Sequence, residues 1–427
     1  MFKLKYNFIV LIQIIFSILN SILLIKIFGV SAKSDAYLLS CSILAIIHLI
    51  LILPVFQFIP FYNDLKVKSL KKSHDFYNYL MLFSLLYGVI LCLLFLFGIN
   101  ILVKIFTLHI DAERLILLKQ LLSISIFGSA FYTINELNAQ LLNAEMKFSL
   151  PYIISTIPNM CIVASQLYLI HIHSQNIILL AYAQAIALLL GAILGTLYIT
   201  KTLIRFKPVF IYEGISKFIK NSVGMQLGNS IYHICFPIIL NNFLVTMPKG
   251  FVSYFYYARK IIDIINSFTI GPSAKILRSR IAEYFAKKLL PEINKSIKSF
   301  NLWGAIIFIV AIIIAYYAQT PILKLINNHL TYTDLNMIKQ IFLSLTAWYY
   351  FMLIESPYVV INMTSKKEWI LIIVNSSFVI IFILGMLALH HKIGIYSVGI
   401  SALVAQYFNY IWHKKFALKT LKSLSDN

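Results

Sequence analysis

Long, nearly uncharged apolar runs dominate this sequence, and they restrict the chain to one kind of environment. The run at residues 371–389, LIIVNSSFVIIFILGMLAL, contains no charged side chain. About 20 such residues form a helix that can cross the hydrocarbon core of a bilayer. Hydrophobic residues make up 60% of the chain and charged residues 12%, so comparable runs recur along its length. Because spans in lipid must satisfy their own backbone hydrogen bonds, we predict an all-α polytopic membrane protein.

The runs can be counted as about twelve transmembrane helices. The simplest organisation is two six-helix lobes, residues 1–210 and residues 211–427, joined by a basic loop. The halves share polar residues at a nearly constant spacing. The matching positions, at offsets of 218 or 219, are Pro54 with Pro272, Glu136 with Glu355, and Asn143 with Asn362. Since six spans return the chain to the same side, we predict parallel repeats with a substrate path between them, as in transporters.

The positive charge of the chain follows its loops. The formal net charge is +21, but 24 lysines and arginines fall in alternate loops and only 9 in the opposite loops or at the outer ends of spans. By the positive-inside rule this split places both termini in the cytoplasm. The basic loops therefore indicate topology and attraction to anionic membrane lipids, and nucleic acid is not expected as a partner.

Motifs of common enzyme classes are absent from the sequence. It contains no phosphate-binding GxxxxGK[ST] loop, no HExxH, no DxD and no nucleophile elbow. The four cysteines all fall within apolar runs without a CxxC spacing. We therefore expect no enzyme activity, no metal and no cofactor.

Two predicted spans carry polar residues along one helical face. The stripe in the seventh span consists of Gln226, Asn229, Ser230 and His233, and that in the first span of Gln13, Ser17, Asn20 and Ser21. Such stripes serve either for hydrogen bonding between helices or as the wall of a water-filled cavity. The sequence leaves both interpretations open, and the presence of a stripe in the first helix of each half favours the cavity.

The stretch YYARKIIDIIN, residues 256–266, places three charges inside a predicted span. If this span begins near residue 251, Lys260 lies about 14 Å along it, close to the middle of the membrane. Arg259 and Asp263 are four residues apart and can neutralise each other, which makes Lys260 the surplus charge. The three residues form either a structural salt-bridge cluster or a cationic site for an anionic head group.

Three segments resemble the MurJ (MviN) family of lipid II flippases, within the multidrug/oligosaccharidyl-lipid/polysaccharide exporter superfamily. They are KIFGVSAKSDAYLLS (26–40), QLLNAEMKFSLPYIISTIPN (140–159) and FLVTMPKGFVSYFYYARK (243–260). The resemblance implies two six-helix lobes that alternate in access around a cationic cavity, with an undecaprenyl-diphosphate-linked sugar as cargo. It also implies that Asp35 matches the family's acidic residue, that Lys260 matches its cation in the eighth span, and that His48 replaces its arginine in the second span.

These observations predict a flippase of the bacterial inner (cytoplasmic) membrane. Its substrate-binding residues would be Lys260, Arg259, His48, Asp35, Gln226, Asn229, His233, Gln13 and Asn20. The cargo would be a precursor of O-antigen or capsule, as in twelve-span Wzx-type flippases, or a lipid II-like molecule. Glycan polymerases and glycosyltransferases are further candidate partners.

Two alternatives remain open. One is a cation-coupled drug or metabolite antiporter of the same superfamily, and the other is a scaffold without transport. Carboxylates would dominate the site of an antiporter, and the candidates for coupling or gating are Glu136, Glu355 and Asp263.

Overall fold

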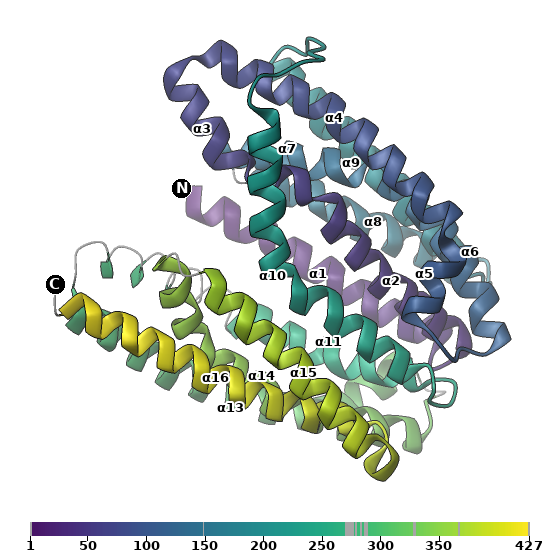
Figure 1. Cartoon of the computed structure of the whole chain (residues 1–427). Helices are drawn as coiled ribbons and strands as arrows, with labels where there is room; N and C mark the ends of the chain where they lie inside the picture. Colours follow the sequence, from purple (N-terminus) through teal and green to yellow (C-terminus); the bar gives the residue numbers. More distant parts are fainter. Residues whose placement is uncertain are drawn as a thin grey trace. The chain divides into compact units, whose positions relative to one another are not determined.

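Helices are the only regular elements in the part of the chain that the structure describes (Figure 1). This computed structural model describes residues 2–425 apart from residues 148, 270–276, 278–279, 282–283, 286–288, 328–329 and 366–367. Within helices, the side chains of residues 2–10, 60, 217, 221–229, 267–269, 368 and 424–425 are also outside the description. The predicted all-α class is confirmed.

The chain divides into two compact units, Met1–Leu227 and Gly228–Asn427. The helix α10 (Ile215–Leu244) crosses this division, which lies further along the chain than the lobe boundary predicted at residues 210 and 211. That predicted boundary, between residues 1–210 and 211–427, remains a prediction.

The first unit consists of helices of very different lengths, and one of its described spans is bent at a break. Its elements are α1 (Phe2–Phe28), α2 (Ala32–Leu51), the short 3₁₀ helix η1 (Leu53–Val55), α3 (Phe58–Lys68), α4 (Leu70–Phe97), α5 (Ile99–Phe106), α6 (Ala112–Ser129), α7 (Tyr132–Ala144), α8 (Ser149–His171) and α9 (Ile178–Thr202). The helices α6 and α7 form one span with a bend of 43°. Pro54 lies in η1, where the chain leaves α2, because a proline cannot donate the hydrogen bond that would continue a helix.

In its described residues, the second unit contains the rest of α10 and five long helices. These are α11 (Phe251–Thr269), α13 (Leu290–Ile326), α14 (Tyr332–Thr364), α15 (Glu368–Ile393) and α16 (Tyr396–Ser425). Small residues allow close packing: a Cβ atom at Gly399 of α16 would collide with the backbone of Ser344 in α14, and one at Gly385 of α15 would collide with Ser401 in α16.

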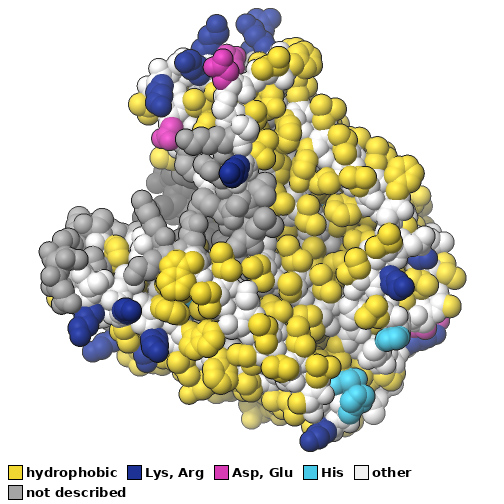
Figure 2. All heavy atoms as spheres, viewed as in Figure 1, with side chains coloured by type: hydrophobic (Ala, Val, Ile, Leu, Met, Phe, Trp, Pro, Cys, Tyr) yellow, Lys and Arg dark blue, Asp and Glu magenta, His cyan; other side chains and the backbone are white. Residues whose placement is uncertain are grey.

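Most of these helices have the length and composition of membrane spans. Eight of the described helices pass as spans, and the bent pair α6–α7 makes nine. The helices α10, α11 and α16 have 30, 19 and 30 residues but are more polar, and counting them brings the total to the predicted number of about twelve. Figure 2 shows hydrophobic side chains covering the sides of the helices, whereas lysines gather where α3 meets α4.

Candidate functional site

The helix α11 carries its charges beside a buried apolar stripe. The stripe recurs every three or four positions and consists of Val252, Phe255, Ala258, Ile262 and Ile265. At about 100° per residue, Arg259, Lys260 and Asp263 fall together on another side of the helix. Because α11 begins at Phe251, Lys260 lies about 14 Å along its axis, as the sequence suggested.

Asp263 is held by partners from two helices. The Arg259 Nε and Asp263 Oδ2 atoms are 3.8 Å apart, so the ion pair predicted from the i,i+4 spacing is confirmed. The hydroxyl of Tyr349, on α14, donates a hydrogen bond of 2.9 Å to Asp263 Oδ1. The side chains of Arg259 and Asp263 are 30% and 46% exposed, so this group lies at an accessible surface of the second unit. Arg259, Lys260 and Asp263 together carry a net charge of +1.

The helix α10 places His233 near the charged residues of α11. The His233 side chain is exposed, and Arg259 is near enough for its charge to act on both Tyr232 and His233. The two helices are also linked directly, because the Tyr256 hydroxyl donates to Asn241 Oδ1 at 3.0 Å. The side chains of Gln226 and Asn229 lie outside the described part, as does Pro272, so the cavity interpretation of this stripe remains a prediction.

Glu355 of α14 lies at the centre of a buried hydrogen-bonded chain between α14 and α16. Its side chain and that of His413 are 8% and 2% exposed. Gln406 donates to Glu355 Oε2 through its side-chain amide, and His413 Nε2 is 3.4 Å from Glu355 Oε1. The Asn362 amide donates to His413 Nδ1 at 3.1 Å, so the proton of a neutral His413 ring lies on Nε2, facing the carboxylate.

The direction of these bonds is uniform. Trp348 Nε1 donates to Gln406 Oε1 at 3.3 Å, and Gln406 in turn donates to Glu355. On the other side, Asn362 donates to His413, whose Nε2 atom faces the carboxylate. Gln406 and His413, the two side chains next to Glu355, therefore both face it with donors, an arrangement that satisfies an ionised carboxylate, which only accepts hydrogen bonds. A protonated Glu355 would carry an O–H donor, to which neither Gln406 nor His413 presents an acceptor in this arrangement.

Glu136, the matching residue of the first half, has different surroundings. It lies half-buried on α7 and accepts a hydrogen bond of 2.8 Å from Gln140 of the same helix. At the offset of 219, the partners Gln406 and His413 correspond to Ala187 and Leu194, which cannot donate. The repeat therefore conserves the carboxylate position but not its polar chain.

The polar stripe of α1 is used for packing at two of its positions. Gln13 Nε2 is 3.3 Å from Ser155 Oγ on α8. Asn20 receives hydrogen bonds from Gln166 Nε2 at its side-chain oxygen, at 2.9 Å, and at its backbone carbonyl. These contacts correspond to the interhelical interpretation of the stripe.

His48 lies in the last turn of α2, beside the bend between α6 and α7. Its ring stacks on Tyr132 with centroids 3.8 Å apart, and its Nε2 atom is 2.9 Å from Ser129 Oγ. Thr133 Oγ1 also donates to the Leu51 carbonyl at 3.0 Å. These contacts fasten the end of α2 to the break between α6 and α7.

Asp35 is completely buried near the start of α2. Its Oδ2 atom is 3.4 Å from Nη1 of Arg114, whose side chain is only 4% exposed and also pairs with Asp111. The ion pair joins α2 to the first turn of α6. This geometry favours a structural role, and a contact of Asp35 with substrate remains a prediction.

Comparison with known proteins decides the family. The family model described as "Lipid II flippase MurJ" matches residues 24–423. The chain belongs to the MurJ family.

Curated relatives of this MurJ-family chain are distant in sequence. Two proteins called "Probable lipid II flippase MurJ", from two subspecies of Buchnera aphidicola (strains Bp and APS), are each 24% identical to it. The first alignment covers 78% of this chain and 67% of the relative, and the second covers 77% and 65%. The chain thus spans about two thirds of the length of these MurJ relatives.

Solved structures agree with the family in fold. A lipid II flippase MurJ in an inward closed conformation has a TM-score of 0.79 at 18% identity, covering 98% of this chain and 87% of that one. An inward-facing multidrug resistance MATE transporter of the MOP superfamily has a TM-score of 0.74 at 13% identity, covering 96% of both chains. The two-lobed MurJ-like fold predicted from the sequence is confirmed.

One polar group of this MurJ-family chain was not predicted from the sequence. Glu145 follows α7 outside the spans and accepts hydrogen bonds from Tyr62 and Lys66 of α3, at 2.9 and 2.6 Å. Tyr62 and Lys66 are four residues apart, so one face of α3 reaches one carboxylate. The sequence feature that could have indicated this contact is the four-residue spacing of Tyr62 and Lys66 in a short helix with aromatic residues. This helix packs in the core through Phe58 and Tyr62.

Acid is expected to weaken this contact. Burial alone disfavours the ionised Glu145, but the hydrogen bonds from Lys66 and Tyr62 outweigh it and lower the pKa of the carboxyl. A carboxyl with a lowered pKa in the folded state stabilises the fold above its unfolded pKa and loses that contribution as the pH falls. Since Lys66 is 37% exposed, the contribution is about 1 kcal/mol. Thermal unfolding of the purified protein should therefore show Glu145→Gln less stable at neutral pH, with the difference vanishing in acid.

The exposed Glu213 provides the control for this prediction. Glu213→Gln should follow the unaltered protein at every pH. A stability difference for Glu145→Gln that persists unchanged in acid would contradict the proposed ion pair.

Proposed function

We propose that this protein moves a polyprenyl-diphosphate-linked sugar across the cytoplasmic membrane by alternating access. The observation that carries the proposal is the cationic side of α11 in a chain whose residues 24–423 match the lipid II flippase family. Lys260, which is half-buried and lies near the middle of the helix, would attract the diphosphate. The ion pair of Arg259 with Asp263 would set the net charge beside it. The test is transport of such a lipid by the purified protein, with Lys260→Ala as the inactive control.

The chemistry of the cargo suits this site. A diphosphate carries about two negative charges, and moving each outward across an inside-negative membrane gains about 2.3 kcal/mol per 100 mV. Lysine acts as a point charge, whereas arginine grips phosphate with two parallel hydrogen bonds. A lysine at this position therefore favours release of the head group after transport, and the potential can drive export without ATP.

The proposal also concerns the identity of the sugar on the transported lipid. The diphosphate is common to lipid II and to the precursors of O-antigen and capsule, and the cationic site recognises that common part. We favour a precursor of O-antigen or capsule, the kind of cargo that Wzx-type flippases carry. A glycan polymerase or glycosyltransferases would then be partner proteins. Comparison of transport for two lipids that share the diphosphate but differ in sugar would distinguish these cargoes.

A second candidate function is antiport coupled to a cation. The observation that favours it is Glu355, a carboxylate buried between α14 and α16 with neutral donors on both sides. Uptake of a proton there would reverse one hydrogen bond of the chain and so couple ion binding to helix packing. This candidate shares alternating access with the flippase but replaces the lipid-linked sugar with a small molecule.

We propose that both termini are cytoplasmic, and this topology can be measured independently of the cargo. Cysteines placed at Ser69, between α3 and α4, and at Ser423, near the end of α16, should react with a membrane-impermeant reagent only from the cytoplasm. A cysteine at Ser174, between α8 and α9, should react only from outside. Labelling of Ser174→Cys from the cytoplasmic side would reverse the assignment.

A further inference from the structure

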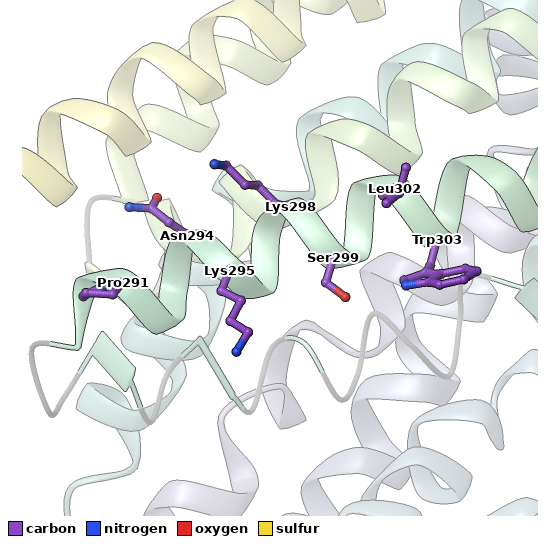
Figure 3. A pocket seen from close by; sticks show the side chains of 7 residues that line it. All are labelled: Pro291, Asn294, Lys295, Lys298, Ser299, Leu302 and Trp303. Atoms are coloured by element: carbon purple, nitrogen blue, oxygen red, sulfur yellow. The ribbon is translucent and has the colours of Figure 1, made fainter.

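The first turns of α13 carry a shallow groove that the proposed transport path does not use. The groove has a volume of about 480 Å³. Two rows of side chains four residues apart line it (Figure 3): Asn294, Lys298 and Leu302 in one row, and Lys295, Ser299 and Trp303 in the other. Pro291, at the start of the helix, closes its end.

Each row changes from polar to apolar at the same level. Lys295 and Lys298 are exposed and come first, whereas Leu302 and Trp303, two turns further along, are 59% and 60% exposed. The exposed apolar surface then continues along α13 through Ile306, Val310, Ile314 and Tyr317. Large apolar side chains with this exposure on a membrane span face lipid tails, so the change at Leu302 and Trp303 marks the boundary between head groups and hydrocarbon.

The charge of the groove has one sign. Lys295, Lys298 and the hydroxyl of Ser299 are hydrogen-bond donors within reach of the same hollow. Glu292 is exposed one turn earlier and is not among the lining residues, so residues 291–303 keep a net charge of +1. The pattern fits an anion joined to an apolar chain, because a free phosphate has no apolar part that could contact Leu302 and Trp303.

We propose that this groove binds the head group of an anionic phospholipid. The phosphate lies between Lys295 and Lys298 with Ser299 as a further donor, and an acyl chain follows Leu302, Trp303 and the apolar side of α13. The lipid belongs to the leaflet on the side where α13 begins, which the charge distribution of the loops assigns to the cytoplasm. The site fixes the depth of α13 in the membrane and does not depend on the identity of the transported cargo.

Fluorescence of Trp303 tests this site directly. The full chain is reconstituted in phosphatidylcholine vesicles with a fixed minority of phosphatidylglycerol, and either lipid carries brominated acyl chains that quench nearby tryptophans. Because the chain has four tryptophans, the signal of Trp303 is taken as the difference between the unaltered protein and Trp303→Phe. We expect brominated phosphatidylglycerol to be preferred over brominated phosphatidylcholine by about 25-fold at low salt, since each of the two lysines near the membrane surface adds about fivefold.

Two variants decide the origin of the preference. Lys295→Gln with Lys298→Gln should reduce it to near equality, and salt should weaken it in the unaltered protein because the Debye length shortens. Lys324→Gln, in the last turn of the same helix, is the matched control and should leave it unchanged. Equal quenching by both lipids, or a preference that survives the double substitution, would overturn the proposal.

Discussion

Replacing Lys260 with alanine is expected to abolish export of lipid-linked sugar while leaving the protein folded and inserted. The substitution removes the net positive charge of the α11 cluster, because Arg259 and Asp263 offset each other. Two opposite charges 4 Å apart interact by about 4 kcal/mol at an effective dielectric constant near 20. Losing that energy at the rate-limiting step slows transport about a thousandfold, so export falls below detection. The measurement is surface display of the glycan, normalised to the amount of protein in the membrane.

Companion variants separate charge from packing. Lys260→Arg should retain part of the activity, because the charge is kept. Arg259→Ala removes a partner of Asp263, but Asp263 is nearly half exposed and keeps the hydrogen bond from Tyr349. The loss of stability is therefore about 1 kcal/mol or less, and Arg259→Ala with Asp263→Ala should restore the abundance.

Lys392→Ala, which removes an exposed lysine near the end of α15, is the control and should have no effect on export. Full export by Lys260→Ala at normal abundance would show that these charges serve the helix bundle and not the cargo.

Substitution of Glu355 is expected to have the second largest effect, and its two forms should differ. Glu355→Ala leaves the donors of Gln406 and His413 buried without an acceptor, and each costs about 1 to 3 kcal/mol. The amount of folded protein in the membrane should therefore fall strongly. Glu355→Gln keeps one acceptor and the side-chain volume, so more protein should survive, but it cannot take up a proton. If Glu355 couples transport to protons, Glu355→Gln transports at a rate that no longer changes with pH.

Glu136→Gln is the matched control, because it alters the repeat-related carboxylate without touching a buried chain of donors. It should reduce abundance little and leave the pH dependence intact. Equal abundance of Glu355→Ala and the unaltered protein would contradict the structural role assigned to the buried chain.

Contacts between residues of one helix could be predicted from the sequence, whereas contacts between different helices could not. The spacing of Arg259 and Asp263 was enough to predict their ion pair, because helical neighbours follow from the helix period. Tyr349, the other partner of Asp263, is 86 residues away, and nothing in the stretch around it marks that contact. In the same way the repeat identified Glu355, while its donor Gln406 lies 51 residues further along the chain.

The apolar runs predicted the fold because a helix that spans a membrane must be long and mostly apolar. Helices with several polar residues are harder to recognise as spans by this criterion. The helices α10 and α11 are less apolar than ordinary spans since they carry His233, Arg259, Lys260 and Asp263. The stripe of α1 resembled a cavity wall, yet Gln13 and Asn20 contact α8, because polar residues also join helices in membranes. Composition alone could not separate these two uses.

The most direct test of the flippase proposal is transport by the purified protein in sealed vesicles. A lipid-linked, diphosphate-bearing sugar is placed in both leaflets, and the fraction that an externally added, membrane-impermeant enzyme can modify is followed over time. We predict that the protein makes the inner pool accessible, that an applied membrane potential changes the rate, and that Lys260→Ala behaves like vesicles without protein. An inner pool that stays protected in the presence of folded, correctly inserted protein would contradict the account.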